Sequence, residues 1–435
     1  MTKRLVIGAC MMALAVTAVS AKAKKVEQGK VLNIYVWNDE FKSRFNDFYA
    51  SRLPAGVKVN FIQTPNQDNA YQNKLDEALL KQAKAKADEK VDLFCVEADY
   101  ALKYVNSEAT LDVYKDVGLT AKDTANQLQY TKDIMTSAKK QLKGVSWQST
   151  PAGMIYRRSI AKAVLGTDDP AKVQAQVSDM SKFKAVAAKM KAAGYTMVSG
   201  YDDMFRLYYD NMKSAFVKGN KIVIDPKINE WIADTKEFTD KGWNAKTSLW
   251  STEWSANMKK NAKVFCFFGP GWFFDYSMSG NAEDNPGKKD GSYGDWAIVK
   301  GPAAFSWGGT WICAAAGTDN IDIIKDVMLT LTCDTATLKK IAINAGDCVN
   351  SVAAMKEISA SGYKNAFLGG QDNQAFFAEN ASALSKRGNM SMYDQGMVEQ
   401  IQGAMKDYFA GSVSLDKAWS NFYTAIQEKY PNLQK

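Results

Sequence analysis

The stretch VLNIYVWNDEF, residues 31–41, decides the fold that we expect for this chain. Its first seven residues are rich in β-branched and aromatic side chains, which predicts a strand over 31–37. The polar turn after this strand leads into Phe41, Phe45 and Phe48, whose spacing is that of one helical face. A strand that runs directly into a helix is the first half of a βαβ unit.

The same alternation continues along the chain. VKVNFIQT (57–64) predicts a second strand, and Tyr71, Leu75 and Leu79 predict the helix after it. VDLFCVE (91–97) predicts a third strand, short and apolar as buried parallel strands are. This order predicts an α/β fold with a parallel sheet covered by helices. Ligands of such sheets bind beyond the carboxyl ends of the strands.

The pattern restarts in the second half of the chain. Phe183, Val186 and Met190 predict a helix that Gly194 ends, and KVFCFFGPGWFF (263–274) predicts a buried strand broken by Gly-Pro-Gly. We find no internal repeat and no low-complexity linker. The two halves are therefore expected to be lobes joined by crossing strands rather than by a flexible tether.

The first 21 residues have the order of a secretory signal peptide: two basic residues, an apolar run and a small-residue cleavage site. We expect cleavage after Ala21, or alternatively after Ala23. Cys10 lies in a sequence that resembles a lipoprotein cleavage box, so a lipid anchor is the less favoured alternative. The exported remainder, about 400 residues long, is expected to form two or more domains.

Composition excludes several classes of function. The chain has no histidine, which excludes Ser-His-Asp and Cys-His mechanisms and histidine-ligated metals. The net charge of +8 is interleaved with acidic residues, so no basic stripe for nucleic acid is present. The loop 281–285 does not match a calcium-loop pattern. We therefore expect no metal, no cofactor and no nucleic-acid partner.

The cysteines outside the signal segment are odd in number. Cys95, Cys266 and Cys313 lie in apolar runs and are expected to be small core residues. Cys333 and Cys348 are either bridged or free, and the sequence leaves both possibilities open.

Tryptophan is unevenly distributed, with eight of the eleven between Trp231 and Trp311. Trp272 follows Gly269-Pro270-Gly271, and Trp307 precedes Gly308-Gly309, where glycine lets a ligand come close. Indole rings offer flat faces on which the C–H faces of sugars can stack. For each of these tryptophans a core position is an equally good interpretation, and for Trp231 and Trp419 the core is favoured.

Carboxylates follow several of the predicted strands. Glu97 and Asp99 come directly after the third strand, and Asp39 and the pair Asp202-Asp203 occupy analogous turns. Such residues are often only solvated, but their position at strand ends favours a role in binding.

Several segments, taken in this order, resemble the extracellular solute-binding proteins of family 1, the carbohydrate receptors of ABC importers that include the maltose-binding proteins. The segments are VLNIYVWNDEF, VDLFCVEADYALKYV, GVSWQSTPAGMIYRRSIA, SGYDDMFR, FFGPGWFF, GPAAFSWGGTWICAAAG and FLGGQDNQAFFA. The resemblance covers nearly all of the chain after the signal segment. It implies a two-lobed periplasmic-binding-protein fold, type II-like, with crossing hinge strands and a sugar held between the lobes.

The resemblance also implies the residues that bind the ligand. They are carried over by matching motif: Asn38, Asp39, Glu40, Glu97, Asp99, Trp147, Gln148, Tyr201, Asp202, Arg206, Trp272, Trp307, Gly308 and Gly309. Two departures separate this chain from the maltose receptors. The acidic residue of their first crossing strand is replaced here by Gln148 or Thr150, and Tyr100 stands where they carry an arginine. Maltose itself is therefore not the expected ligand.

The function expected from the resemblance is capture of a carbohydrate, with an oligosaccharide favoured, and delivery to a membrane permease, without catalysis. The expected protein is a monomer in the periplasm or at the outer face of the cytoplasmic membrane. The expected lobes are 30–148 with 301–345, and 149–300 with 346–435. Three alternatives remain: a receptor of the same fold for a polyamine or another small solute, a secreted glycoside hydrolase with a carboxylate pair, and a surface adhesion protein.

Overall fold

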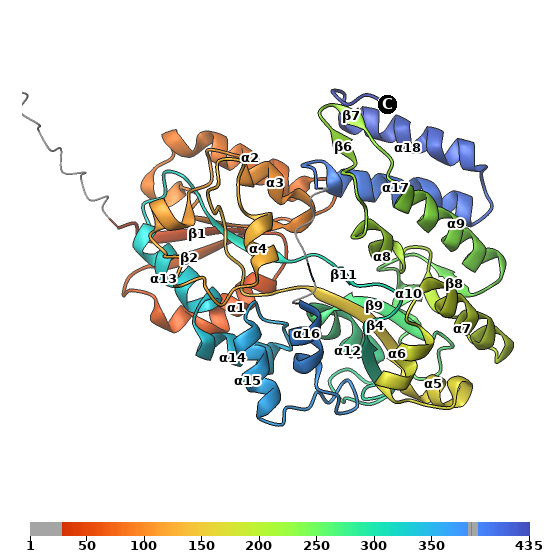
Figure 1. Ribbon diagram of the computed structural model, residues 1–435. Helices are drawn as coiled ribbons and strands as arrows, with labels where there is room; N and C mark the ends of the chain where they lie inside the picture. Colours follow the sequence, from red (N-terminus) through yellow and green to blue (C-terminus); the bar gives the residue numbers. More distant parts are fainter. Residues whose placement is uncertain (1–27, 382–383, 385–389) are drawn as a thin grey trace, which may run out of the picture.

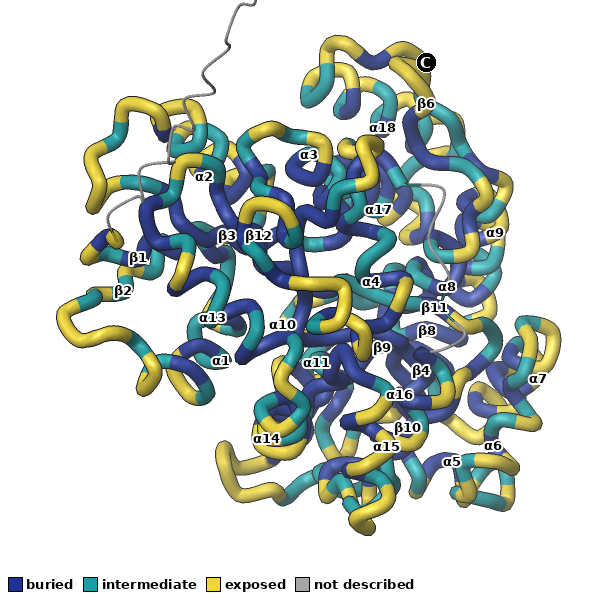
Figure 2. Tube along the Cα trace, turned by 60° about the vertical axis from the view of Figure 1, so that its left-hand side comes forward, coloured by how far each residue is buried: buried dark blue, intermediate teal, exposed yellow. Residues whose placement is uncertain are grey.

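The computed structural model describes residues 28–381, 384 and 390–435, so the expected signal peptide and Cys10 lie outside the described residues. The chain forms two lobes, each built around a four-stranded sheet (Figure 1). Strands and inward helix faces are buried in both lobes, and exposed residues concentrate in the outer loops (Figure 2). This arrangement is the two-lobed α/β fold expected from the sequence.

The N-terminal lobe contains the sheet that the opening stretch predicts. Its strands lie in the order β12-β3-β1-β2, with β1 parallel to both β2 and β3. The fourth strand, β12, returns from far along the chain and runs antiparallel to β3. The strands are β1 (Val31–Val36), β2 (Lys58–Gln63), β3 (Leu93–Glu97) and β12 (Thr310–Ala314).

Helices connect and cover this sheet. Phe41 and Phe45 of α1 and Tyr71 and Leu75 of α2 face the core, as their spacing predicts. The helices are α1 (Glu40–Phe48), α2 (Ala70–Lys81), α3 (Ala101–Val105), α4 (Gln129–Ile134), α13 (Ile321–Thr332) and α14 (Thr335–Ala345).

The C-terminal lobe is centred on a strand that pairs antiparallel with three others. The central strand is β4 (Pro151–Arg157), and its partners are β9 (Cys266–Pro270), β10 (Trp296–Val299) and β11 (Phe305–Ser306). A parallel pair, β5 (Val198–Gly200) and β8 (Asn244–Thr247), and a short hairpin, β6 (Val217–Lys218) and β7 (Lys221–Ile222), complete the strands. The strand predicted over 263–274 ends at the Gly-Pro-Gly break, where a short helix replaces it.

The helices of this lobe surround these strands (Figure 1). They are α5 (Arg158–Leu165), α6 (Pro170–Gln176), α7 (Met180–Ala192), α8 (Phe205–Tyr209), α9 (Pro226–Asp240), α10 (Thr252–Ala256), α11 (Gly271–Phe273), α12 (Ser279–Ala282), α15 (Val352–Ala360), α16 (Asn373–Ala381), α17 (Asp394–Phe409) and α18 (Leu415–Lys429). The last two helices pack on each other, and α17 also packs on α9.

The chain crosses between the two sheets at 146–150 and again at 307–309. Val145 still bridges Ile312 of the first sheet, whereas β4 belongs to the second sheet. The return path leaves the second sheet at β11 and enters the first at β12, with Gly308 and Gly309 between them. The expected crossing strands are therefore present.

The cysteines are unbridged in the described part of the chain. Cys95, Cys266 and Cys313 are buried core residues, as the sequence predicts. Cys333 and Cys348 are free, which decides the question that the sequence left open. Within the described residues no helix is long and apolar enough to cross a membrane.

Candidate functional site

A two-pronged ion pair joins the lobes. Asp99 lies in the 3-10 turn Ala98–Tyr100 directly after β3, and Arg206 lies on α8 of the other lobe. The two carboxylate oxygens of Asp99 accept hydrogen bonds from the Arg206 guanidinium at 3.1 and 2.7 Å. The Asp99 side chain is only 6% exposed and that of Arg206 only 15%. Paired, charge-assisted bonds of this kind are among the strongest polar contacts in proteins, so the pair holds the lobes together.

Glu97 and Gly308 lie beside this ion pair. The Glu97 carboxylate accepts a hydrogen bond of 2.7 Å from the backbone N–H of Asp99, which shapes the turn after β3. Gly308 has a φ of +70°, and a Cβ atom there would lie 3.5 Å from Glu97 Oε1 and 3.6 Å from Trp272 Nε1. Glycine therefore brings the second crossing segment close to a carboxylate of one lobe and an indole of the other.

Two indoles line the same place. The rings of Trp272 and Trp307 lie 5.2 Å apart at 68°, and Trp272 Nε1 donates a hydrogen bond of 3.2 Å to the Trp307 carbonyl. The Arg206 guanidinium lies 5.6 Å from the centre of the Trp307 ring, within reach of a cation–π contact. We call the set Glu97, Asp99, Arg206, Trp272 and Trp307 the interlobe junction.

A small cavity opens beside the interlobe junction. Its volume is about 30 Å³, which is room for water but not for a sugar ring. Burial raises the pKa of the Asp202 carboxyl in its wall to about 6, although Asp202 accepts a hydrogen bond from the Leu249 N–H. The lining residues are Asp202, Asp203, Arg206, Leu249, Trp254, Phe268, Trp307 and Gln402.

Tyr201 and Asp203 support this cavity from behind. The ring of Tyr201 stacks on Phe409 at 6.0 Å and is buried in the lobe. Asp203 accepts hydrogen bonds from the N–H groups of Ser199 and Gly200 and from the Trp254 indole, each at 2.7 Å. Both residues therefore stabilise the turn that carries Asp202.

A second group of predicted residues is buried at the crossing strands. Gln148 Nε2 donates to Glu40 at 2.8 Å, and Thr310 Oγ1 donates to the other oxygen of Glu40 at 3.2 Å. Asp347 accepts bonds from Arg44 at 2.8 Å and from the indole of Trp147 at 3.2 Å. We call the set Glu40, Arg44, Trp147, Gln148, Thr310 and Asp347 the hinge cluster.

The hinge cluster is electrostatically unusual. Burial, and after it the nearby Asp347, raise the pKa of the Glu40 carboxyl to about 7, although Arg44 and the two hydrogen bonds act to lower it. Trp147 is fully buried, so its ring presents no face to a ligand in this conformation. The cluster ties α1 to both crossing segments.

The remaining predicted residues lie at the edges of these two sets. Asn38 accepts a hydrogen bond from the Glu40 N–H, and the exposed Asp39 pairs with Lys42 at 3.3 Å. Gly309, with a φ of +116°, lies against the ring of Trp311, which is a core residue.

Comparison with known proteins agrees with this geometry. The sequence profile of the bacterial extracellular solute-binding proteins matches residues 45–360. The chain belongs to this family. Its members are exported receptors that bind solutes. No curated protein matches the chain.

Solved structures of similar shape cover nearly the whole solute-binding protein. A structure of an extracellular solute-binding protein family 1 member matches 92% of this chain and 99% of its own, with a TM-score of 0.75 and 16% identity. The ABC transporter-associated binding protein of B. animalis subsp. lactis Bl-04, in complex with β-1,6-galactobiose, matches 93% and 99%, with a TM-score of 0.67 and 16% identity. The GacH receptor of Streptomyces glaucescens matches 94% and 100%, with a TM-score of 0.67 and 14% identity. These similarities establish the fold.

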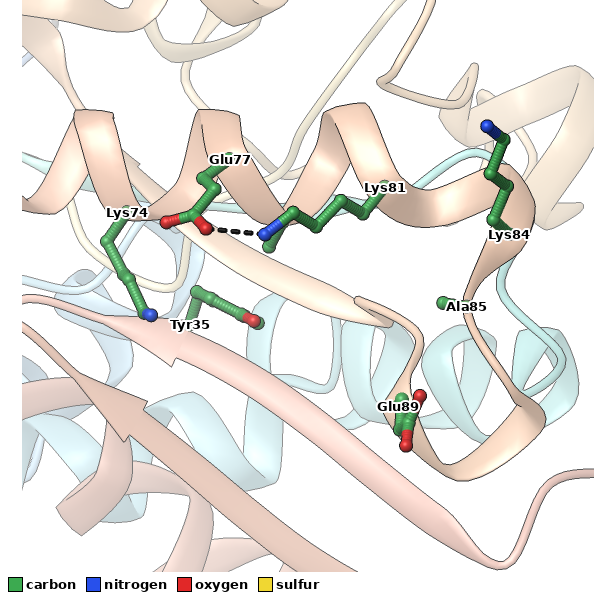
Figure 3. A pocket seen from close by; sticks show the side chains of 8 residues that line it. Tyr35, Lys74, Glu77, Lys81, Lys84, Ala85 and Glu89 are labelled. Carbon is green, nitrogen blue, oxygen red and sulfur yellow. Dashed lines mark hydrogen bonds and ion pairs between the residues drawn. The ribbon is translucent and has the colours of Figure 1, made fainter.

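Larger hollows of this solute-binding protein lie away from the predicted residues. One, of about 420 Å³, is bordered by α2 and Tyr35 on the N-terminal lobe. Figure 3 shows its lysine-rich wall, where Glu77 pairs with Lys81 and Lys84 points away. Another, of about 550 Å³, lies between α15 and α16. None of the predicted residues lines either hollow.

Sequence reasoning missed several residues at the interlobe junction. The Tyr209 hydroxyl lies 3.4 Å from a carboxylate oxygen of Asp99 and 3.1 Å from one of Asp394 on α17, and its single proton can be donated to either. Trp250 and Tyr276 are exposed aromatic residues next to Trp307 and Trp272. Trp250 follows β8 by only a few residues, but the sequence pattern does not predict a strand there, so the strand-end rule that selected Glu97 could not select Trp250.

Proposed function

We propose that this solute-binding protein captures a carbohydrate between its lobes and delivers it to the permease of an ABC importer. The observation that carries the proposal is the convergence of acidic, cationic and indole side chains from both lobes at the interlobe junction. Indole faces suit the C–H faces of sugars, and carboxylate and guanidinium groups suit their hydroxyls. The neighbours bound to β-1,6-galactobiose and to acarbose support this class of ligand.

The interlobe junction is closed in this structure, and this determines how a ligand can enter. The cavity of about 30 Å³ cannot admit a sugar ring, so the ligand enters after the Asp99–Arg206 pair has parted. A ligand that contacts both lobes then replaces this pair and binds the closed form better than the open form. The closed, loaded form is the one that docks on the permease.

Charge balance favours a neutral ligand. Asp99 is the acid of the junction that bridges the lobes, and both of its carboxylate oxygens already accept hydrogen bonds from Arg206. A polyamine would have to displace this guanidinium, whereas a sugar hydroxyl can bond to either partner. We therefore favour a neutral polyol that is released unchanged.

The residues that we propose to contact the ligand are the five members of the interlobe junction, together with Asp202 and Gly308. The other residues implied by the family resemblance support these contacts by shaping turns and crossing segments: Asn38, Asp39, Glu40, Trp147, Gln148, Tyr201 and Gly309. We place the lobes at 30–148 with 307–345 and at 149–306 with 346–435; the boundary near 301 that the sequence suggests moves to 307 because β11 pairs with β4. The protein acts as a monomer in the periplasm or at the outer face of the membrane, and acylation of Cys10 is the alternative mode of attachment.

The test is a thermal-shift screen against mono- and oligosaccharides, followed by calorimetry on the best ligand. A ligand that binds only the folded state raises the melting temperature. Trp272→Ala should weaken binding at least about tenfold, and the matched variant Trp419→Ala, on α18, should leave binding unchanged. The proposal fails if no sugar stabilises the protein, or if prolonged incubation converts the sugar to products. Salt-sensitive binding of a polyamine would favour the alternative receptor.

A further inference from the structure

We propose that Trp250 and Tyr276 form an outer subsite that binds the sugar units beyond the first, so that the protein prefers an oligosaccharide to a short sugar. This inference rests on the proposed function. Trp250 is 48% exposed and Tyr276 is 65% exposed, which is unusual for large aromatic side chains. Their rings are neighbours, 6.2 Å apart.

These two rings continue the indoles of the interlobe junction. Trp250 lies 5.9 Å from Trp307, and Tyr276 lies 6.1 Å from Trp272. We call the four residues Trp250, Trp272, Tyr276 and Trp307 the aromatic wall. It runs without interruption from the small closed cavity, which Trp307 lines, to side chains that face solvent.

The outer end of the aromatic wall is held in place at a conformational cost. Trp250 has a φ of +66°, a left-handed backbone conformation that a bulky side chain rarely adopts. Behind it lie the rings of Trp254, at 5.3 Å, and Phe273, at 6.0 Å. The preceding residue, Leu249, donates its N–H to Asp202 in the cavity wall. A strained conformation fixed from two sides indicates that the position of the ring matters for binding.

The geometry of the aromatic wall suits a chain of sugars better than a protein surface. The rings of Trp250 and Tyr276 meet at 83°, and those of Trp272 and Tyr276 at 75°. Steeply inclined rings present separate faces to successive units, whereas a docked helix lays one apolar face into a hydrophobic groove and a docked strand needs a free sheet edge. Tyr276 also lies on a π-helical turn, Phe274–Met278, a local irregularity frequent at functional sites.

The experiment compares disaccharides with hexasaccharides of the malto, cello and xylo series by calorimetry. For a linkage that binds, we expect the hexasaccharide to bind at least about tenfold more tightly than the disaccharide. Trp250→Ala and Tyr276→Ala should each remove most of this difference and leave the disaccharide affinity unchanged. Trp419→Ala removes an indole on α18, away from the aromatic wall, and should leave the affinity for both lengths unchanged. Tyr276 is mostly exposed, so its variant keeps the test valid if Trp250→Ala does not fold.

The outcomes separate this inference from the proposed function. Equal affinity for both lengths, or variants that weaken both equally, would overturn the outer subsite alone. Failure of every sugar to bind would overturn the proposed function and the subsite together. A dimer that Trp250→Ala dissociates while oligosaccharide binding is unaffected would show that the exposed rings serve a second copy of the chain instead.

Discussion

The interlobe junction and the hinge cluster are built from the same kinds of side chain. Each contains an arginine–carboxylate pair, Arg206 with Asp99 at 2.7 Å and Arg44 with Asp347 at 2.8 Å. Each also contains tryptophan. The difference is what surrounds them: the junction joins two lobes and adjoins exposed rings, whereas Trp147 and Asp347 of the hinge cluster are almost completely buried.

This difference matches the proposed division of roles, in which the hinge cluster holds the fold together and the junction binds the ligand. In that proposal the lobes part and water reaches the charges of the junction, so their pairing is reversible. The charges of the hinge cluster stay buried in either state, because the cluster ties α1 to both crossing segments. Breaking an ion pair should therefore cost far more at the hinge than at the junction.

The largest expected effect is that of Asp347→Ala. It leaves the guanidinium of Arg44, only 11% exposed, without its partner and removes the acceptor of the Trp147 indole. We expect the free energy of unfolding to fall by about 3–5 kcal/mol, measured by urea denaturation. The exposed Lys339–Glu357 pair provides the control, since Glu357→Ala should cost less than about 1 kcal/mol. Equal losses for the two variants would remove the distinction between hinge and surface.

The next effect is a pH dependence that originates in the hinge cluster. The pKa of Glu40 is about 7 in the folded protein, above its ordinary value of 4.5. Between these values the folded state holds a proton that the unfolded chain has lost. The stabilisation from Glu40 is therefore complete below about pH 4.5 and is lost as the pH rises to 7, by up to ~3 kcal/mol.

Glu40→Gln should remove this contribution. Urea denaturation of the variant and the wild type, at several pH values between these two pKa values, measures the difference in slope. Glu230→Gln, at an exposed glutamate on α9, should keep the wild-type slope. A Glu40→Gln slope equal to that of the wild type would mean that Glu40 is ionised throughout.

A smaller effect on stability is expected for Asp99→Asn at the junction. The variant loses the ionic part of the contact with Arg206, but opening of the lobes lets water reach the guanidinium. We expect a loss of about 1–2 kcal/mol, together with a larger radius of gyration in X-ray scattering without ligand. A loss as large as that of Asp347→Ala, with no expansion, would show that the junction is a permanent part of the fold.

The smallest effect on stability is expected for Gly308→Ala, at a φ of +70°. The left-handed backbone costs an alanine about 1 kcal/mol. Gly317→Ala, at a φ of +85° and away from the junction, should cost the same and serves as the control. Only the variant at Gly308 should weaken sugar binding, by about tenfold, because its methyl group points to Glu97 and Trp272. Equal sugar affinity in both variants would exclude Gly308 from the ligand site.

Much of the architecture follows from local patterns. Two strand ends, at Glu97 and Pro270, match their predicted positions. The buried faces of α1 and α2 also match, because apolar residues on a buried helix face recur at a regular spacing in the sequence. The strand-end rule also selected Asp99, whereas Trp307 was selected by its neighbouring glycines and Arg206 by the family resemblance. The resemblance did not separate Arg206 and Trp307 from Trp147, which is buried in the core.

The sequence by itself determined the α/β alternation, the two crossings and the residue types available at each strand end. Only the tertiary structure decided which of those residues meet. Asp99 and Arg206 are 107 residues apart, and Glu40 and Thr310 are 270 residues apart. Periodicity reports which face of an element is buried, whereas contacts between distant elements depend on the packing of whole lobes. This is why similar Trp, Asp and Arg patterns give a buried cluster at the crossing strands in one place and an ion pair between the lobes in the other.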